Sequence, residues 1–389
     1  MSTAPATAEA ADAGEVAAAV RDAPFVRVVA AADGDALAAS GVLARALKER
    51  GTPFQVRVEA VPDPVPGDGD DLALGVGAGS AGGDRSLGGS APASLTAALV
   101  ARELDADVDP LLALAGVATA AQPLDAGDAS AVLDAARERT TVERRPGLAV
   151  PTTDLSEGLA HSTLVHAPVS GDPETARDAL DDLGIGSELT EEDHRRLASW
   201  LAIEATASSA RAADAVERVL HPHATPDAPF ATVEGFGDVL DAVARERPGT
   251  GVALAIRDGG LRSAALDAWR THARATHEAL TAATTGRYDG IFVARAEDAD
   301  PGRLATVARL CRDFQSPEPV TLVVGDGGAA AASVDDARLG RAMREAVQAV
   351  DGDGQSAGDG TRATARFEDD GEDENGAVSR FVTAFREAL

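Results

Sequence analysis

Short apolar runs alternate with longer segments rich in Ala and Leu, and this alternation limits the chain to few architectures. Phe25–Ala31 is a short apolar run, and Asp35–Arg50 carries small and leucine side chains at helical spacing and is closed by Gly51. Phe54–Val61 alternates apolar with polar residues, and Leu72–Val76 is again apolar. Strands that alternate with helices build parallel sheets. The sequence therefore predicts an α/β fold.

The rest of the chain continues this pattern, with one long helical segment. His221–Pro229 (HPHATPDAP) is a Pro-rich break and the best candidate for a domain boundary. We expect a leader over residues 1–24, a first domain with a helical extension over 25–220, and a smaller α/β domain over 230–389. The further helices expected are 93–104, 109–121, 128–139, 174–219, 234–246, 262–284, 302–314 and 378–389. The further strands expected are 251–256, 290–295, 320–324 and 363–367, and 351–360 is expected to be a loop.

The first residues, MSTAPATAEAADAGEVAAAV, carry acids and no basic stretch. They match neither a secretory signal nor an Arg-rich transit peptide, so we expect a disordered leader. No run of 18 apolar residues occurs, which predicts no membrane span. The single cysteine, Cys311, cannot form an intramolecular disulfide, and a cytoplasmic location is expected.

The chain is strongly acidic. It holds 64 Asp and Glu against 35 Lys and Arg, a net charge of −29, and only Lys48 is a lysine. At 1 M salt the Debye length is only ~3 Å, so acidic self-repulsion is screened. The composition suggests a halophilic protein. Acidity is then a background trait, and it does not exclude a nucleic-acid partner as it would in dilute buffer.

Asp33 and Asp35 form an Asp-x-Asp pair between the first strand and the first helix. Oxygen ligands on alternate residues of an extended turn can face one side and hold Mn²⁺ or Mg²⁺. Two such ions can bind a phosphodiester and activate water. The alternative interpretation is structural, because an aspartate before a helix commonly caps its first backbone N–H groups.

The segment Val26–Ser40 (VRVVAAADGDALAAS) resembles the first motif of the DHH phosphoesterase superfamily, where a strand ends in His-x-Asp-x-Asp-Gly before a small-residue helix. Residues 89–104 and 110–122 are similar to two helices of archaeal RecJ-like proteins. Residues 230–251 and 287–325 look like the lead into, and the core of, the DHH-associated domain. The resemblance covers most of the chain from Phe25. It implies a parallel-sheet DHH domain with a helical extension, followed by a DHH-associated domain.

The departures from the family pattern bear on activity. The first-motif histidine falls at Ala31, the glycine after the second aspartate is Ala36, and the fourth-motif aspartate falls at Ala120. The third strand and its end, Leu72–Gly77, hold no acid, and the Asp-His-His triplet is absent, since no histidine precedes His161. The family's substrate-gripping Gly-Gly-Gly-His loop has its nearest match at Gly352, Gly354, Gln355 and Gly358, with an alternative register at 325–328.

The resemblance with these departures implies a catalytically degenerate, RecJ-like protein of DNA replication or repair. Such a protein would hold single-stranded nucleic acid, or replication proteins of the GINS and MCM type, without cutting, and would need no cofactor. Its nucleic-acid contacts are expected at Gly352, Gly354, Gln355 and Gly358. The alternative is a 5′→3′ single-strand exonuclease that uses Asp33 and Asp35 as catalytic residues and ligands for Mn²⁺ or Mg²⁺. A third interpretation is a metabolic α/β protein.

Other motifs are weaker. His221 and His223 are expected in a plain loop, and His272 and His277, about 140° apart on a helix, are expected at the surface. No Walker-type phosphate loop is present. The acidic run 368–374 (EDDGEDE) is expected to be a solvated loop.

Overall fold

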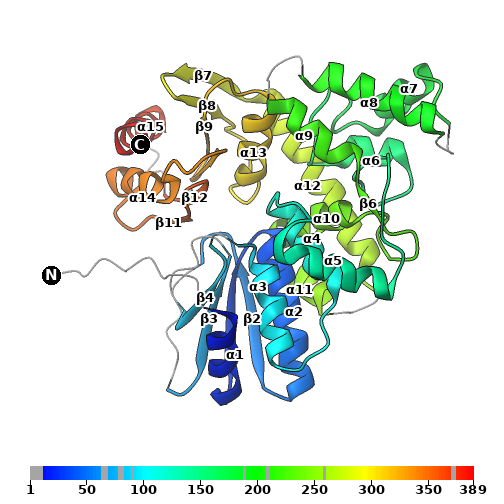
Figure 1. The fold of residues 1–389 in the computed structure, drawn as a ribbon. Helices are drawn as coiled ribbons and strands as arrows, with labels where there is room; N and C mark the ends of the chain where they lie inside the picture. Colours follow the sequence, from blue (N-terminus) through cyan, green and yellow to red (C-terminus); the bar gives the residue numbers. More distant parts are fainter. Residues whose placement is uncertain are drawn as a thin grey trace. The chain divides into compact units, whose positions relative to one another are not determined.

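The computed structural model describes residues 12–62, 69–77, 83–89, 91–186, 190–206, 211–256, 260–368 and 374–389 (Figure 1). The chain forms two compact units. Unit 1 comprises Met1–Val142, Asp227–Pro229 and Val239–Ala268. Unit 2 comprises Glu143–Pro226, Phe230–Asp238 and Trp269–Leu389. No described helix is both long and apolar enough to cross a membrane.

Unit 1 is built on a parallel four-stranded sheet in the order β2-β1-β3-β4. The strands are β1 (Val26–Ala31), β2 (Phe54–Glu59), β3 (Leu72–Val76) and β4 (Arg85–Leu87). The chain goes from β1 outward to β2 and then returns past β1 to β3. The carboxyl ends of β1 and β3 therefore meet at the point where the winding direction changes, which is where α/β sheets bind ligands.

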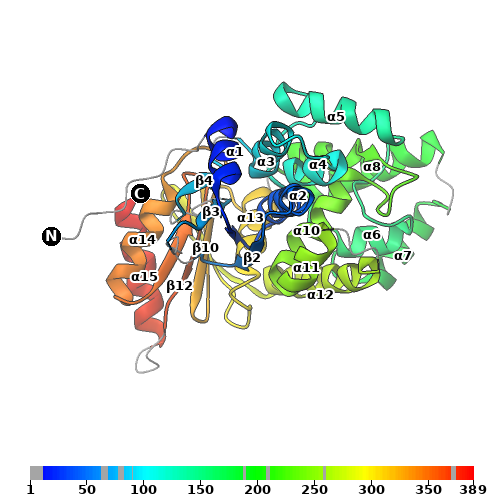
Figure 2. The same ribbon diagram turned by 90° about the horizontal axis from the view of Figure 1, so that it is seen from below.

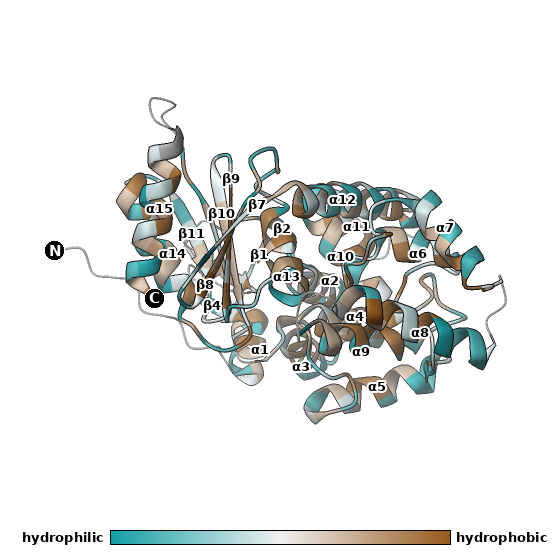
Figure 3. Ribbon diagram, turned by 90° about the horizontal axis from the view of Figure 1, so that it is seen from above, coloured by the Kyte–Doolittle hydropathy of each residue, from teal (hydrophilic) through white to brown (hydrophobic). Residues whose placement is uncertain are grey.

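Helices of small residues pack closely in unit 1. They are α1 (Ala13–Asp22), α2 (Gly34–Arg50), α3 (Ala93–Glu103), α4 (Pro110–Thr119), α5 (Gly127–Arg139) and α11 (Pro248–Ala255). A Cβ added at Gly41 of α2 would lie 2.5 Å from the Ala255 Cβ of α11. Small side chains on α2 thus let neighbouring helices approach its backbone. Figure 3 shows that α4, one of these helices, is coloured largely as hydrophobic.

Two expectations fail in unit 1. Helix α1 occupies 13–22, where a disordered leader was expected; Asp12 caps it and Val16, Ala17 and Val20 are buried. Residues 1–11 of that leader lie outside the described residues. The expected strand 251–256 is wrong as well, because these residues continue helix α11, which starts at Pro248. A short apolar run does not distinguish a strand from a buried helix, and proline in the first helical turn was the overlooked signal.

Unit 2 combines helices with a mixed six-stranded sheet in the order β11-β12-β10-β9-β8-β7. The strands are β7 (Thr284–Tyr288), β8 (Ile291–Arg295), β9 (Val320–Gly325), β10 (Gly328–Ser333), β11 (Gln355–Gly358) and β12 (Arg362–Arg366), with β5 (Glu143–Arg144) and β6 (His223–Ala224) as a separate pair. The helices that lie wholly in unit 2 are α6 (Leu155–His161), α7 (Pro173–Asp182), α8 (Glu191–Thr206), α9 (Arg211–Leu220), α13 (Leu304–Phe314), α14 (Leu339–Val350) and α15 (Glu374–Ala388).

Each face of this sheet has its own apolar core. Met343, Phe381 and Phe385 of α14 and α15 pack on Ala329, Ala331, Ala363 and Ala365, while α13 packs on the opposite face against Val323, Ala330 and Ala332. Figure 2 shows α14 and α15 side by side along the sheet. Residues 143–220, expected as an extension of the first domain, share the α13 core through side chains such as Leu148 and Val219. The division into independently folding domains stays a prediction.

Helices α10 (Val233–Glu246) and α12 (Arg262–Ala282) each contribute residues to both units. In α10 the change falls between Asp238 and Val239, and in α12 it falls between Ala268 and Trp269. The two cores are therefore joined by continuous helical backbone at two places.

The expected loop 351–360 is wrong in part, because Gln355–Gly358 is strand β11, paired antiparallel with β12. The sequence QSAG has little strand character of its own, so pairing with β12 determines this conformation. The alternative register at 325–328 is a two-residue hairpin between β9 and β10, with Gly327 at φ 69°. Asp-Gly is a typical sequence for such a turn, which explains those glycines without a ligand.

Candidate functional site

The Asp-x-Asp pair lies where the β1 and β3 strands end in unit 1, at the winding change of the sheet. Asp33 follows β1 in extended backbone, at φ −139° and ψ 166°, and is the N-cap of α2. Its Oδ1 accepts the Ala36 N–H at 2.8 Å. One carboxylate of the predicted pair is thus used to satisfy the first turn of the helix that follows it.

The Asp35 carboxylate accepts hydrogen bonds from a different helix, α3. Its Oδ2 accepts the Ala93 N–H at 2.7 Å and its Oδ1 accepts the Ser94 N–H at 3.0 Å. Helix α3 begins after Pro92, which provides no side-chain cap. Asp35 therefore caps α3 from α2, over 58 residues of sequence.

Burial changes the acidity of Asp35. Its side chain is almost fully enclosed, and burial, with the Asp33 charge as a second cause, raises its pKa to about 6. Hydrogen bonds from Ser94 and Ala93 oppose this rise. Burial outweighs these hydrogen bonds, so the Asp35 carboxylate binds a proton more readily than a solvent-exposed aspartate does.

The remaining family positions offer no ligands. A Cβ built on Gly77, at the end of β3, would lie 3.0 Å from the Ala31 Cβ and 2.9 Å from the Ala36 Cβ. Gly77 also has φ 96°, a conformation that other residues avoid. Ala120, at the fourth-motif position, is the C-cap of α4. The three atoms nearest to that built Cβ are the Ala36 and Ala31 methyl carbons and, at 3.7 Å, Asp33 Oδ2, so a larger side chain at Gly77 does not fit without movement of its neighbours.

Two further carboxylates, Asp71 and Asp84, lie near β3 and have partners of their own. Asp71 pairs with Arg27 at 2.8 Å, and Asp84 accepts the Ala73 N–H at 2.9 Å. Within the described part of the chain, no group of three or more His, Cys, Asp and Glu side chains is arranged to hold a metal ion. The donor set around Asp33 and Asp35 therefore does not fit a two-metal hydrolase.

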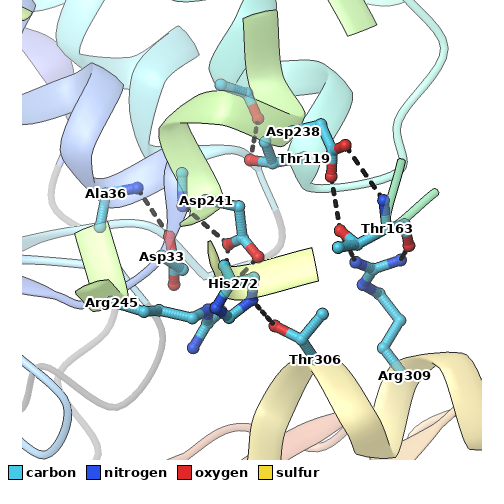
Figure 4. A network of polar contacts seen from close by, with 12 residues as sticks. Asp33, Ala36, Thr119, Thr163, Asp238, Asp241, Arg245, His272, Thr306 and Arg309 are labelled. Atoms are coloured by element: carbon cyan, nitrogen blue, oxygen red, sulfur yellow. Dashed lines mark hydrogen bonds and ion pairs between the residues drawn. The ribbon is translucent and has the colours of Figure 1, made fainter. Parts of the chain in front are cut away.

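Asp241 is a further acid at the N-terminus of α2 that sequence reasoning missed. Its Oδ1 accepts the Gly34 N–H at 3.0 Å, and Arg245 donates to it at 3.0 Å (Figure 4). The i,i+4 spacing of Asp241 and Arg245 on α10 predicts their ion pair. Nothing in the sequence indicates that this pair meets a residue 207 positions earlier.

The residues expected to bind nucleic acid lie in unit 2 at and before the edge strand β11. Gly354 and Gly358 are packed: a Cβ on Gly354 would lie 2.6 Å from Val347 Cγ1, and one on Gly358 would lie 2.4 Å from the Arg362 carbonyl oxygen. Only Gly352 has open space around it. These glycines therefore allow close packing of α14, β11 and β12 and do not form a free glycine loop.

Gln355 belongs to a more polar face of the same sheet. It lies opposite Arg366 on β12, and Ala357 lies opposite Thr364, with Arg362 two residues further along. Directly opposed residues of antiparallel strands share a face. Since Ala363 and Ala365 point to the α14–α15 core, Gln355, Thr364, Arg362 and Arg366 share the other face, where both arginines are exposed. We call these four residues the β11–β12 face.

His272 and His277 were expected at the surface and are fully buried in unit 2. His272 bonds the Thr306 hydroxyl at 3.0 Å (Figure 4). His277 Nε2 lies 3.1 Å from the Ser162 carbonyl oxygen, and its Nδ1 lies 3.1 Å from His166 Nδ1. Burial, followed by His166, lowers the pKa of His277 to about 3. The expectation failed because α12 is enclosed on more than one side.

Asp238 is a buried hydrogen-bond acceptor in the same part of unit 2. It accepts a hydrogen bond from the Trp269 indole. Figure 4 shows its bonds from the Thr163 N–H and hydroxyl, and the bond that Arg309 donates to the Thr163 carbonyl oxygen. The burial of Asp238 raises its pKa. His223, expected in a plain loop, lies in β6 and bonds Glu234 at 2.8 Å. These contacts fix loops to helices and bring no second acid into a shared site.

A protein of Haloarcula marismortui, described as "Uncharacterized protein rrnAC1427", is 46% identical over 380 residues, which cover 97% of this chain and 96% of that protein. The family model described as "Uncharacterized protein rrnAC1427, C-terminal domain" matches residues 283–387.

Similar solved structures are RecJ and CDC45 proteins. CDC45 from Entamoeba histolytica has a TM-score of 0.57 at 9% identity, covering 96% of this chain and 97% of that one. Exonuclease RecJ bound to manganese has a TM-score of 0.52 at 14% identity, covering 97% and 95%. RecJ of Thermus thermophilus with Mg²⁺ has a TM-score of 0.51 at 16% identity, and this chain, 98% covered, spans 54% of its length. This chain therefore has a fold like that of RecJ and CDC45, and it belongs to the family of the Haloarcula marismortui protein rrnAC1427.

Proposed function

We propose that this chain is a non-catalytic, RecJ-like protein of DNA replication or repair. The observation that carries the proposal is the use of Asp33 and Asp35 as caps of α2 and α3, with Ala31, Ala36 and Gly77, which cannot ligate a metal through a side chain, beside Asp33. A hydrolase that positions water with two metal ions needs several oxygen or nitrogen ligands around them. In this proposal, Asp33 and Asp35 stabilise the first turns of two helices and do not position water for hydrolysis.

The β11–β12 face supports a binding role. In a chain of net charge −29, Arg362 and Arg366 expose two positive charges beside Gln355 and Thr364 on one face of a sheet. Arginine and neutral hydrogen-bonding side chains are the groups that contact phosphate and sugar. We propose single-stranded nucleic acid as the ligand. Replication proteins of the GINS and MCM type are the protein partners that we propose.

The nuclease alternative is tested with a 5′-labelled single-stranded oligonucleotide in molar KCl with Mn²⁺. We expect no degradation by folded protein. The controls are Asp33→Ala/Asp35→Ala and, because loss of Asp35 removes the cap of α3, the milder Asp33→Asn, which retains a capping oxygen. Degradation by the wild-type chain that both variants lose would overturn the proposal and establish a metal-dependent exonuclease.

Binding is tested by fluorescence anisotropy with the same oligonucleotide, at the lowest KCl concentration that leaves the far-ultraviolet circular dichroism unchanged. Arg362→Ala/Arg366→Ala should weaken binding by roughly tenfold and reduce the salt dependence by about 1.4 in log–log slope, the value for two lost phosphate contacts. The matched control is Arg344→Ala/Arg380→Ala, which removes two exposed arginines from α14 and α15 of unit 2. Equal losses in both variants would contradict a role for the β11–β12 face.

A further inference from the structure

A pair of histidines joins helix α12 to the segment that follows α6, both within unit 2. His277 of α12 is buried, and His166 of the segment is half-buried. Their Nδ1 atoms are 3.1 Å apart. The ring planes differ by 21° and the centroids are 5.2 Å apart, so the lone pair of one ring can face the N–H of the other. On its other side, His277 Nε2 lies 3.1 Å from the Ser162 carbonyl oxygen.

The Ser162 carbonyl group determines where the hydrogens of this pair lie. A carbonyl oxygen only accepts hydrogen bonds, so His277 Nε2 carries a hydrogen. In a neutral imidazole the other nitrogen is then an acceptor, which makes His166 Nδ1 the donor of the bond between the rings. The two bonds therefore run in one direction, from His166 through His277 to Ser162.

The peptide group between Ser162 and Thr163 continues this series of hydrogen bonds to helix α10. Its N–H, that of Thr163, donates to Asp238 Oδ2 at 3.1 Å, and Asp238 is only 2% exposed. Arg309 of α13 donates to the Thr163 carbonyl oxygen at 3.0 Å (Figure 4). Each donor points toward the buried carboxylate, an arrangement in which successive hydrogen bonds polarise and strengthen one another. Three helices thus hold the backbone at Ser162 and Thr163.

We propose that His166, His277 and Asp238 form an acid-sensitive clamp on the Ser162–Thr163 peptide group. Only one hydrogen fits between the two facing Nδ1 atoms, so the folded protein cannot charge both histidines and keep the bond between them. In the unfolded chain each histidine binds its own proton. Acid therefore breaks the bond and releases the segment after α6 from α12. The inference goes beyond the scaffold function, because it requires neither nucleic acid nor a metal ion.

The surroundings of His277 also oppose a positive charge. Burial is the largest cause, and together with neighbouring imidazoles it lowers the pKa of His277 to about 3. Three histidines act in this direction: His166 in the segment after α6, His161 on α6 and His272 on α12. The Ser162 carbonyl group acts against it. The charged groups on the adjoining Thr163 are Asp238 of α10 and Arg309 of α13.

The test is His277→Gln, whose amide offers one donor and one acceptor and takes up no proton. Unfolded His277 binds a proton as pH falls through 6.5, and folded His277 does so only near pH 3. The contribution of neutral His277 is therefore complete above pH 6.5 and is lost as pH falls. From pH 7 to pH 4.5, the unfolding equilibrium constant of the wild type should rise about 80-fold relative to that of the variant.

Urea unfolding in molar KCl, followed by tryptophan fluorescence, measures both proteins. The matched control is His221→Gln, which makes the same change at an exposed histidine and should leave the pH dependence of the wild type unaltered. The same pH dependence in wild type and His277→Gln would overturn the proposal.

A second measurement on the wild type covers the case in which His277→Gln does not fold. Long-range ¹⁵N–¹H spectra of protein labelled at histidine report the charge and the tautomer of each ring. At pH 6 the His277 ring should be neutral, with its hydrogen on Nε2. A charged ring, or a hydrogen on Nδ1 alone, would overturn the clamp. Neither experiment uses an oligonucleotide, so failure of the nucleic-acid proposal remains a separate result.

Discussion

Asp35 shows how one side chain can be essential to the fold and still weaken it at neutral pH. Its carboxylate satisfies two N–H groups of α3, yet its burial raises its pKa to about 6. The folded state therefore binds a proton that the unfolded state, in which the pKa of aspartate has its ordinary value of 3.8, releases at lower pH. The stability contributed by this proton is complete below pH ~4 and is lost as pH rises through about 6.

We expect Asp35→Asn to remove this pH dependence. The amide oxygen still accepts an N–H bond, and no buried charge forms. Between pH 4 and pH 7 the free energy of unfolding of the variant should rise relative to wild type by on the order of 3 kcal/mol, the value of about two pKa units. Urea unfolding in molar KCl at several pH values measures it.

Asp172→Asn is the matched control with the opposite sign. Asp172 is the exposed cap of α7, and hydrogen bonds from the Thr175 hydroxyl and the Glu174 N–H lower its pKa. The ionised Asp172 side chain therefore adds to the free energy of unfolding at neutral pH, and this contribution is lost as pH falls. The variant should therefore lose stability relative to wild type as pH rises. If the free energy of unfolding relative to wild type changed with pH in the same direction for both variants, burial would not explain the behaviour of Asp35.

At the scale of elements, the ends of strands and helices determine what the site can hold. Gly77 ends β3 at φ 96°, with the Ala31 and Ala36 methyl groups within 3.0 Å of a built Cβ. Gly51 ends α2 at φ 73°, with nothing within 4 Å of a built Cβ. The two glycines share the backbone requirement and differ in the space around them.

Gly51→Ala and Gly77→Ala separate these effects. Gly51→Ala should cost about 1 kcal/mol, from the positive φ alone. Gly77→Ala should cost clearly more, because the new methyl group overlaps two others. Urea unfolding provides both values. Equal costs would mean that the end of β3 has free space, which would reopen the question of a ligand there.

The sequence predicted strands β1, β2 and β3 and helices α2, α3, α4 and α5 of unit 1, because glycine and proline separate strands from helices that are each apolar enough to be recognised. It failed for α11, where Pro248 in the first helical turn was overlooked, and for β11, whose conformation depends on pairing with β12. In the site, Asp33 and Asp35 were found, and capping was recognised as the alternative. The bond from Asp35 to α3 and the contact of Asp241 with Gly34 depend on tertiary packing, which local patterns do not encode.

At the scale of the molecule, the two units share helices α10 and α12, and the chain is highly acidic. Repulsion among 64 acids is screened at molar salt and grows as salt is removed. Both tryptophans, Trp200 and Trp269, belong to unit 2. Fluorescence therefore reports on unit 2, and far-ultraviolet circular dichroism reports on both units.

We expect unfolding when the protein is diluted from molar to millimolar KCl. The fluorescence and circular dichroism transitions should coincide, because shared helices lose support in both cores together. Dilution into molar KCl is the control. Two separated transitions would show that the units unfold independently, and an unchanged protein would contradict the halophilic interpretation.

The capping role of Asp33 and Asp35 has a consequence for how proteins are assigned from motifs. An aspartate that completes a helix is kept by selection for folding, whether or not chemistry occurs beside it. With the glycine at φ 96° after β3, restoring an acid there would require the backbone itself to change. Under the proposed non-catalytic function, a metal-dependent enzyme would not be regained by a few side-chain substitutions alone. Genome searches that count Asp-x-Asp pairs would then group helix-capping proteins with nucleases.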